Sequence, residues 1–465
     1  MSISTQIQIQ IGGENLTRFS KLVINQKVHS HHHFSILQPL PKEFVSQAID
    51  KAQKYVGQSV TINIKPSNMM TNSPLIFNGI ITEAQMIRTS GASGGIIING
   101  YSPTILLEGP PNTRSFNDET LSGIVKEILK NYSGDSLKPT VQKKGQWFFF
   151  NGEELQFGKP KSKNFTLDYG RSLHSFNIEM RAKSLGFEYL GYDPSNGDTQ
   201  KASSAEVDYQ PQDGYSKAIF ESSKKLFTNT STMLYSHSLE EGNSRTHLID
   251  RVTTQLQSRT ADMVTAKGES DETGLRIGDV VSIKEPAFSL TGNILDGLQE
   301  QNFGNYIITD IMHVCDESGT YHNTFDAVPE SVVAPPYGNV HSFPTAESQP
   351  ATVISNADPA GLGRVKVAFA WQKDAGKSTP WIRMVNSHSG GGKGFYFVPE
   401  VGEEVLVAFE GGNAEKPFVL GAMYNGSASS GYSTSGNDKK VIQTRSGTKI
   451  IIRLQIPLKR LISIE

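Results

Sequence analysis

Hydrophobic and polar residues alternate along the first hundred residues, as they do in half-buried β-strands. Ile7, Ile9 and Ile11 are separated by glutamines, and residues 59–65 repeat this alternation. Neighbouring side chains of a strand point to opposite faces, so each run has one apolar face. Further strands are predicted at Leu75–Ile81, Gln85–Thr89, Ile96–Tyr101 and Thr104–Glu108.

Three segments have the apolar spacing of helices. The first, residues 42–56, is followed by Gly57, a residue type that favours the left-handed conformation after a helix. The second has apolar residues three, four, seven and eight positions after Leu121, and Asn117 can cap its N-terminus. The third is Arg245–Thr260.

The C-terminal half of the sequence returns to strand patterns from residue 275. A Pro-rich segment at 334–338 predicts a domain boundary. The alternating apolar residues of 351–426 match a five-stranded barrel of the OB type. A Gly/Ser linker, 426–436, leads into a strand-like tail for which the sequence shows no partner in the same chain.

Composition excludes several classes of protein. Lys and Arg total 44 against 46 Asp and Glu, so the chain lacks the basic surplus that a nucleic-acid coat or polybasic membrane binder needs. The single cysteine, Cys315, excludes an intramolecular disulfide and a multi-cysteine zinc site, and we interpret it as a buried thiol. Residues 1–6 lack a signal-peptide pattern and no run of about 18 apolar residues occurs, so we expect neither Sec export nor a spanning helix.

Candidate catalytic motifs lack the context that their chemistry requires. Residues 91–95 match G-x-S-x-G with Ser93 as the nucleophile, but a strand rather than a helix follows, which favours a hairpin loop. Gly376-Lys377-Ser378 lacks the leading glycine of a phosphate-binding loop. Residues 390–394 are interpreted as a hairpin tip. We therefore expect no catalytic residue, no cofactor and no enzymatic activity.

Two further clusters of titratable side chains occur, one of histidines and one of acidic residues. On a strand, His29, His31 and His33 would share one face beside His32, and an H-x-H pair can chelate zinc or nickel. No neighbouring cysteine or carboxylate completes a ligand set, so we predict a polar strand face and no metal site. The second cluster is interpreted as solvated acidic charge: Glu269, Asp271 and Glu272.

Aromatic residues of the OB-like segment raise nucleic-acid binding as an alternative, because OB domains stack bases on exposed rings. The candidates are Phe369, Trp371 and Trp381. Phe369 and Trp371 share parity with Val365 and Val367, which favours a place in the core.

Several motifs occur in order within residues 358–426. They read Asp358-Pro-x-x-Leu-Gly-Arg-Val-Lys-Val, Trp381-Ile-Arg, Gly394-x-x-Phe-x-Pro-Glu-x-Gly-Glu-Glu-Val and Lys416-Pro-Phe-Val-Leu-Gly-x-x-Tyr-Asn-Gly. This pattern resembles the OB module of VgrG proteins, the spike proteins of type VI secretion and related contractile injection systems. Upstream segments resemble the phage-hub-like region of the same family: Ile98-Asn-Gly-Tyr-Ser-Pro, Trp147-Phe-Phe-Phe-Asn-Gly, Phe157-Gly-Lys-Pro, and His313 followed by Gly319-x-Tyr-x-Asn-x-Phe.

The resemblance implies a mainly β fold with minor α structure. Its expected parts are a first hub-type β-barrel at 1–110, an α/β insertion at 111–200, a second hub-type β-barrel at 201–340, an OB-fold domain at 351–426, and a linker with the start of a trimeric β-prism at 427–465. Two features depart from the family pattern. The segment before Trp147 is shorter than usual, and the tail after Ile451 lacks glycine.

The resemblance further implies a structural homotrimer that docks on a hexameric, Hcp-like tube and forms a membrane-puncturing tip. A PAAR-like tip protein and effectors would attach to it, and the assembly would leave the cytoplasm through the contractile apparatus without a signal peptide. No nucleic acid is expected as a partner. The alternatives are a spike-associated hydrolase that uses Ser93 and an OB-fold binder of single-stranded nucleic acid.

Overall fold

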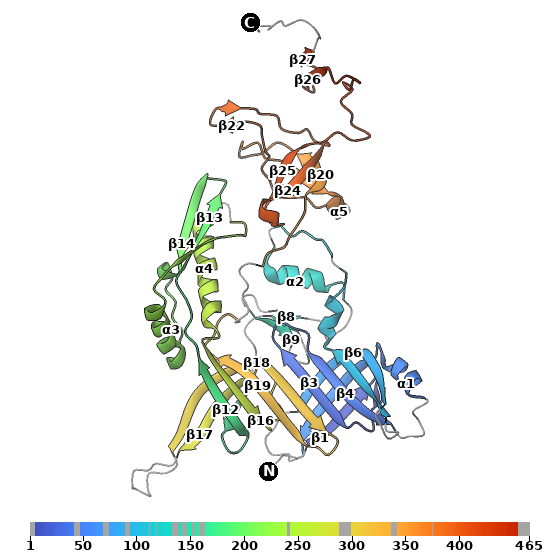
Figure 1. Ribbon diagram of the computed structural model, residues 1–465, viewed down its shortest axis with the longest axis vertical. Coiled ribbons are helices and arrows are strands. Elements are labelled where there is room, and N and C mark those ends of the chain that lie inside the picture. The colour runs from blue at the N-terminus through green and yellow to red at the C-terminus, as the bar shows by residue number, and fades with distance from the viewer. Residues whose placement is uncertain are drawn as a thin grey trace. The chain divides into compact units, whose positions relative to one another are not determined.

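The computed structural model consists of two compact units, which are described separately. Unit 1 comprises Met1–Asn112 and Asp118–Ser342, and unit 2 comprises Thr113–Asn117 and Phe343–Glu465. Strands account for 45% of the residues and helices for 16%, which confirms the mainly β class (Figure 1). The structure describes residues 5–40, 47–67, 74–88, 94–110, 112–117, 119–132, 139–141, 147–150, 153, 155–157, 163–239, 242–287, 299–335, 342–373 and 375–453.

One sheet of thirteen strands is the frame of unit 1. Its strands are β1 (Thr5–Ile11), β2 (Glu14–Asn15), β3 (Lys21–Lys27), β4 (His33–Leu40), β5 (Ser59–Pro66), β6 (Leu75–Arg88), β7 (Gly94–Tyr101), β11 (Asn164–Asp168), β12 (Leu173–Met180), β16 (Val264–Ser270), β17 (Val280–Ala287), β18 (Gln299–Asp316) and β19 (Tyr321–Pro329). Hydrogen bonds connect them in the order β12-β16-β19-β18-β3-β4-β7-β6-β5-β1-β2. In addition, β17 pairs with β18, and β11 pairs with β17.

The described strands do not close into a barrel, because this order ends at β2 and β12 and branches to β11. The two expected barrels are instead two halves of one sheet. Strand β18 joins them. Its N-terminal part pairs with β17, and its C-terminal part pairs with β3, from Asp310 opposite Lys27 to Asp316 opposite Lys21. With 18 residues, against about 5–6 in a typical strand, β18 is long enough to serve both halves.

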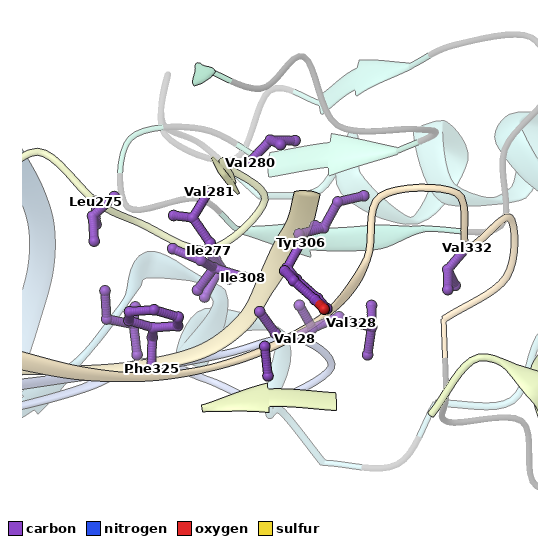
Figure 2. Packing of buried hydrophobic residues seen from close by; sticks show 14 of the residues in the cluster. Val28, Leu275, Ile277, Val280, Val281, Tyr306, Ile308, Phe325, Val328 and Val332 are labelled. Carbon is purple, nitrogen blue, oxygen red and sulfur yellow. The ribbon is translucent and has the colours of Figure 1, made fainter. Parts of the chain in front are cut away.

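Each half has its own hydrophobic core, and the two cores exchange residues across the β3–β18 junction. The N-terminal core includes Cys315 and Tyr321, which come from the C-terminal half. The C-terminal core includes Val28, which directly follows β3 and lies with Ile308 and Phe325 (Figure 2). Neither half can therefore bury its own apolar face completely without the other.

A smaller α/β part is inserted between β12 and β16. Its elements are β13 (Phe187–Asp193), β14 (Asp198–Ser203), α3 (Gly214–Leu226), β15 (Ser231–Leu234) and α4 (Ser244–Thr260). Leu248, Val252 and Leu256 of α4 are buried in its core with Phe187 and Phe220. The helix predicted at 245–260 is confirmed. Unit 1 also contains α1 (Ala48–Tyr55), α2 (Leu121–Leu129), β8 (Pro139–Val141), β9 (Phe148–Phe150) and β10 (Leu155–Phe157).

The other two predicted helices are present, with one change at a cap. Helix α1 is followed by Gly57 at φ +85°, as predicted. At α2 the N-cap is Thr120, whose hydroxyl accepts a hydrogen bond from the Gly123 N–H at 3.1 Å. The prediction of Asn117 as the cap is wrong, because Thr120 directly precedes the first helical turn.

Two strand predictions are also corrected. The strands predicted at 75–81 and 85–89 form the single strand β6, whose pairing with β7 shifts register between Ile81 and Glu83. The strand predicted at 104–108 is a 3₁₀ helix, Pro103–Leu107. Proline has the fixed φ of a helical first turn and lacks the N–H that a strand would use, which explains the difference.

A row of polar side chains is buried where the two halves of the sheet meet. Gln26, His313 and Asn323 are each 0% exposed, and so is His32, which precedes β4. His313 is paired with Ile24 on one side and Asn323 on the other. The register therefore places these polar groups on the same sheet face as the apolar core.

Hydrogen bonds satisfy part of this row. The Tyr321 hydroxyl lies 2.8 Å from His313 Nδ1, and Asn323 Nδ2 donates to the Tyr321 hydroxyl at 3.0 Å and to the Glu272 carbonyl at 2.9 Å. Four atoms of the row have no protein partner: Gln26 Oε1, His32 Nε2, His313 Nε2 and Asn323 Oδ1. Each unpaired buried polar atom costs about 1–3 kcal/mol of stability. These four atoms therefore lower the free energy of unfolding of unit 1.

We predict that acid weakens unit 1 through this row. Burial lowers the pKa of His32 and His313 to about 3, whereas an unfolded histidine titrates near 6.5. The unfolded state takes up protons that the folded state excludes, so each histidine removes about 1.4 kcal/mol of stability per pH unit between about pH 6 and pH 3. The variant His313→Gln should reduce that slope. Urea unfolding followed by Trp147 fluorescence, with tryptophans 371 and 381 replaced by Phe, measures it.

The matched control is His322→Gln, which removes an imidazole from the neighbouring position on β19, outside the buried face. An unchanged slope in His313→Gln, or an equal change in both variants, would contradict the assignment.

Candidate functional surfaces

A four-stranded sheet is the centre of unit 2. Its strands are β20 (Gln349–Ser355), β21 (Lys366–Phe369), β24 (Glu404–Phe409) and β25 (Pro417–Ala422), in the order β21-β20-β24-β25. Where a fifth strand was expected, the segment after Trp381 makes two isolated bridges, Val365 with Ile382 and Met384 with Val419. The OB-type core is present, but the described strands form no closed barrel.

Of the three aromatic candidates for base stacking in this unit, Phe369 is buried, and Trp371 and Trp381 are half-buried. Phe369 is 4% exposed and stacks on Trp371, with ring centroids 5.4 Å apart and planes 5° from parallel. Trp371 lies on helix α5 (Ala370–Lys373), and its Nε1 donates to Gln349 Oε1 at 3.1 Å. Trp381 is half-buried, with Lys366 Nζ 5.3 Å from its ring. The core interpretation of Phe369 is confirmed, and its ring cannot serve as an exposed platform for a base.

The loop from Asp358 to Arg364, part of the motif found in the sequence, is organised by one carboxylate. Asp358 accepts hydrogen bonds from the N–H groups of Ala360, Leu362 and Arg364. The Arg364 guanidinium donates to both carboxylate oxygens, Nε and Nη2 each at 3.0 Å. The hydrogen bonds from Arg364 are the main cause that lowers the pKa of Asp358 to about 2. Gly361 and Gly363 lie at φ +69°, so glycine is required twice in this turn.

Two hairpins of unit 2 expose apolar side chains. The hairpin of β22 (Ser389–Gly390) and β23 (Lys393–Gly394) leads into Phe395, Tyr396 and Phe397, which are all more than half exposed. The second hairpin pairs β26 (Lys439–Gln443) with β27 (Lys449–Arg453). The prediction that the tail has no partner within the chain is therefore wrong for this part, because its two strands pair with each other.

Every residue of β27 is exposed, although the strand is Lys-Ile-Ile-Ile-Arg. Ile450 and Ile452, which share one face, are 58% and 60% exposed. An isolated two-stranded hairpin is marginally stable in water. Both exposed hairpins therefore present surfaces that further protein could cover.

The histidines of 29–33 do not converge. His29 has φ +64°, His32 is in the core, and only His33 belongs to a strand, so the expected common face is wrong. His31 bonds outward, with Nδ1 2.8 Å from Thr104 Oγ1 and Nε2 3.0 Å from Glu108 Oε1. Across the described ranges, no group of three His, Cys, Asp or Glu side chains is arranged to hold a metal ion.

The acidic cluster is buried rather than solvated, which corrects the sequence interpretation. Asp271 and Glu272 are 3% and 8% exposed, and burial raises the pKa of both carboxyls. Asp271 Oδ2 lies 3.4 Å from His174 Nε2. The Glu272 carbonyl accepts two hydrogen bonds, from the Tyr321 hydroxyl and from Asn323 Nδ2, which hold this loop against β19. Glu269 is half-buried.

The other candidates are placed as follows. Cys315 is buried, as predicted, and burial raises the pKa of its thiol. Residues 390–394 form the tip of the β22–β23 hairpin, as predicted. Ser93, the short segment before Trp147 and the tail beyond residue 453 lie outside the described residues. Among the helices that the structure describes, none has the length and hydrophobicity to cross a membrane.

The comparison with protein families gives a match within unit 2. Residues 349–424 match the type VI secretion system/phage-baseplate injector OB domain. Comparison with individual proteins adds VgrG5 of Pseudomonas aeruginosa, a type VI secretion system spike protein that is 31% identical over 189 residues. Over these parts the chain is similar in sequence to a VgrG spike protein.

Each of these VgrG matches covers only part of this chain and part of the relative. The VgrG5 match spans 37% of this chain and 23% of the relative, and a match to VgrG4b of the same organism, 29% identical, spans 41% and 25%. A further relative, 26% identical, is the actin cross-linking toxin VgrG1 of Vibrio cholerae, with 38% and 17% covered. The chain thus covers about a quarter of the length of the first two relatives.

Solved structures extend the likeness to nearly the whole fold. The lidded PdpA-VgrG complex of Francisella covers 95% of this chain and 73% of that chain, with a TM-score of 0.56 and 10% identity. The lidless PdpA-VgrG complex covers 97% and 93%, with a TM-score of 0.54 and 9% identity. At this identity the likeness shows the fold alone.

Sequence reasoning missed the buried polar row at the centre of this VgrG-like fold. The parity of Leu22, Ile24, Gln26 and Val28 places Gln26 on the inward face. That parity does not show that β18 pairs beside β3, with Ile311 opposite Gln26, since the two strands are nearly 300 residues apart in the sequence.

We predict that Asp358→Asn destabilises unit 2 by about 2 kcal/mol at pH 7. The folded pKa of Asp358, about 2, lies below its unfolded value near 3.8, so its stabilisation is present above pH 4 and disappears as the pH falls to about 2. Parent and variant should therefore converge in acid. Urea unfolding followed by the fluorescence of Trp371 and Trp381 measures the difference. The control, Glu347→Gln, removes an exposed acid from the same unit, and an equal loss there would refute the role of Asp358.

Proposed function

We propose that this protein is a non-enzymatic structural component, the hub and spike of a type VI secretion or related contractile injection apparatus. The observation that carries the proposal is the arrangement of unit 2, in which an injector-type OB domain is followed by a β-hairpin whose strand β27 exposes three isoleucines. A spike protein needs such a surface for assembly. The described residues contribute no assembled catalytic group that would favour an enzyme.

We propose that the assembled form is a homotrimer. Ile442 and Ile450 occupy opposite positions in the β26–β27 ladder, and both are about half exposed. Side chains of this kind are stabilised when copies of the same hairpin cover one another, and closed symmetry buries the same surface in each copy. The exposed aromatic residues 395–397 offer each subunit a second apolar surface.

The remaining partners follow from this role. A hexameric, Hcp-like tube would carry the hub, and a PAAR-like protein with effectors would attach beyond the β-hairpin. The target membrane would be pierced mechanically. The chain would assemble in the cytoplasm and leave through the apparatus itself. The near-neutral charge of −2 suits surfaces that are covered by other proteins rather than by nucleic acid.

We predict a mass of three times the 50.9 kDa of one chain by light scattering at micromolar concentration. The double variant Ile450→Glu/Ile452→Glu should lower the mass towards that of one chain, because it places two charges on the apolar face of β27. Lys449→Gln is the matched control, since it changes an exposed polar residue of the same strand and should leave the trimer intact. A parent chain that stays monomeric at this concentration would refute the proposal.

A further inference from the structure

The segment Thr113–Asn117 belongs to unit 2, although the chain on both sides of it belongs to unit 1. We call these five residues the strap. They are more than 220 residues away in sequence from the remainder of unit 2, so only tertiary contacts can hold them there. Those contacts come from one edge of the OB sheet, where β21 passes into α5 and the following turn.

Gln372 makes the most buried of these contacts. Its side chain is 2% exposed, and its Oε1 accepts the N–H of Phe369 at 3.1 Å. At the other end of the amide, Nε2 donates to Ser115 Oγ at 2.8 Å. The strap thus supplies the acceptor that a buried amide group requires, and its departure would leave Nε2 without this partner.

Lys377 and Ser378 hold the strap from the next turn. Lys377 Nζ donates to the Ser115 carbonyl at 3.2 Å and lies 5.1 Å from the centre of the Phe116 ring, within the range of a cation–π contact. Asn117 Nδ2 donates to the Ser378 carbonyl at 2.8 Å. These contacts give a role to two features of the sequence. The Gly-Lys-Ser turn, which lacks the context of a phosphate-binding loop, contacts the strap, and Asn117 of the strap donates to this turn instead of capping α2.

We propose that the β21–α5 edge of the OB unit is a peptide-docking site whose occupant is the chain's own residues 113–117. Docking keeps these five residues on the OB unit, although the chain before and after them belongs to unit 1. The docking does not rest on the proposed function.

Trypsin cleavage after Arg114 can report whether the strap is docked, because Arg114 lies in the strap and directly precedes Ser115. Trypsin needs a locally free segment, so a docked strap is cut slowly and a released strap quickly. In the full-length chain, Gln372→Met/Lys377→Gln should raise the rate of cleavage after Arg114 about tenfold, since it removes two hydrogen bonds to the strap and the cation–π contact with it. These changes leave the cleavage sequence intact. Mass spectrometry identifies the cut site.

Lys373→Gln is the matched control, an exposed lysine of the same helix whose loss should not change the rate. A parent chain cut as fast as a free peptide of residues 110–120, or a rate unchanged in the double variant, would overturn the proposal.

A second measurement does not depend on the stability of the Gln372 variant. In the chain carrying Asn117→Cys and Ser378→Cys, dibromobimane should link the two new thiols and become fluorescent, because docking places residues 117 and 378 in contact. Chains with only one of the two substitutions are the controls. They should stay non-fluorescent, because the remaining thiol, Cys315, is buried. Absence of the cross-link would contradict docking. Light scattering on the same samples separates the two proposals: a docked strap in a monomeric parent would refute only the trimer, and a trimer without docking would refute only the strap.

Discussion

The pairing of β3 with β18 is the interaction on which the rest of unit 1 depends. It joins residues 21–27 to residues 310–316, and it turns two sets of strands into one sheet. Once this register is set, Cys315 and Tyr321 face the N-terminal core and Val28 faces the C-terminal core. A shift by one residue would expose all of these side chains and bury their polar neighbours, because the side chains of a strand alternate in direction.

The same junction contains four of the buried polar atoms that lack a hydrogen-bond partner among the described residues. Gln26, His32, His313 and Asn323 are buried with polar atoms that lack protein partners. Such groups reduce stability. However, the hydrogen bonds of the Tyr321 hydroxyl with His313 and with the Glu272 carbonyl require this strand register, so they favour it over shifted registers. The junction therefore gains specificity from the polar row and stability from the apolar residues on either side.

In unit 2, polar side chains hold irregular backbone beside the four-stranded sheet. The Asp358 carboxylate holds the loop that contains Leu362, and the Gln372 amide holds the segment that contains Ser115. Its hairpins leave isoleucines and aromatic residues exposed. Unit 2 therefore combines irregular segments held by hydrogen bonds with hairpins that leave apolar side chains exposed.

The sequence by itself determined the mainly β class, the buried faces of the regular strands, the presence of helices within 42–56, from Leu121 and at 245–260, and the OB-type core with its motif. These follow from periodicities of two and 3.6 residues and from turn-forming glycines, which are local properties. The candidate chemistry was harder to place. The histidines, the acidic residues 271 and 272 and the Gly-Lys-Ser turn all acquired their surroundings from segments distant in sequence.

Only the tertiary structure decided that β18 serves both halves of the sheet, that the acidic loop is buried beneath β19, and that residues 113–117 dock on the OB edge. The physical reason is that burial and hydrogen-bond partners depend on which strand lies beside which. Alternation along one strand fixes the direction of a side chain but not what covers it.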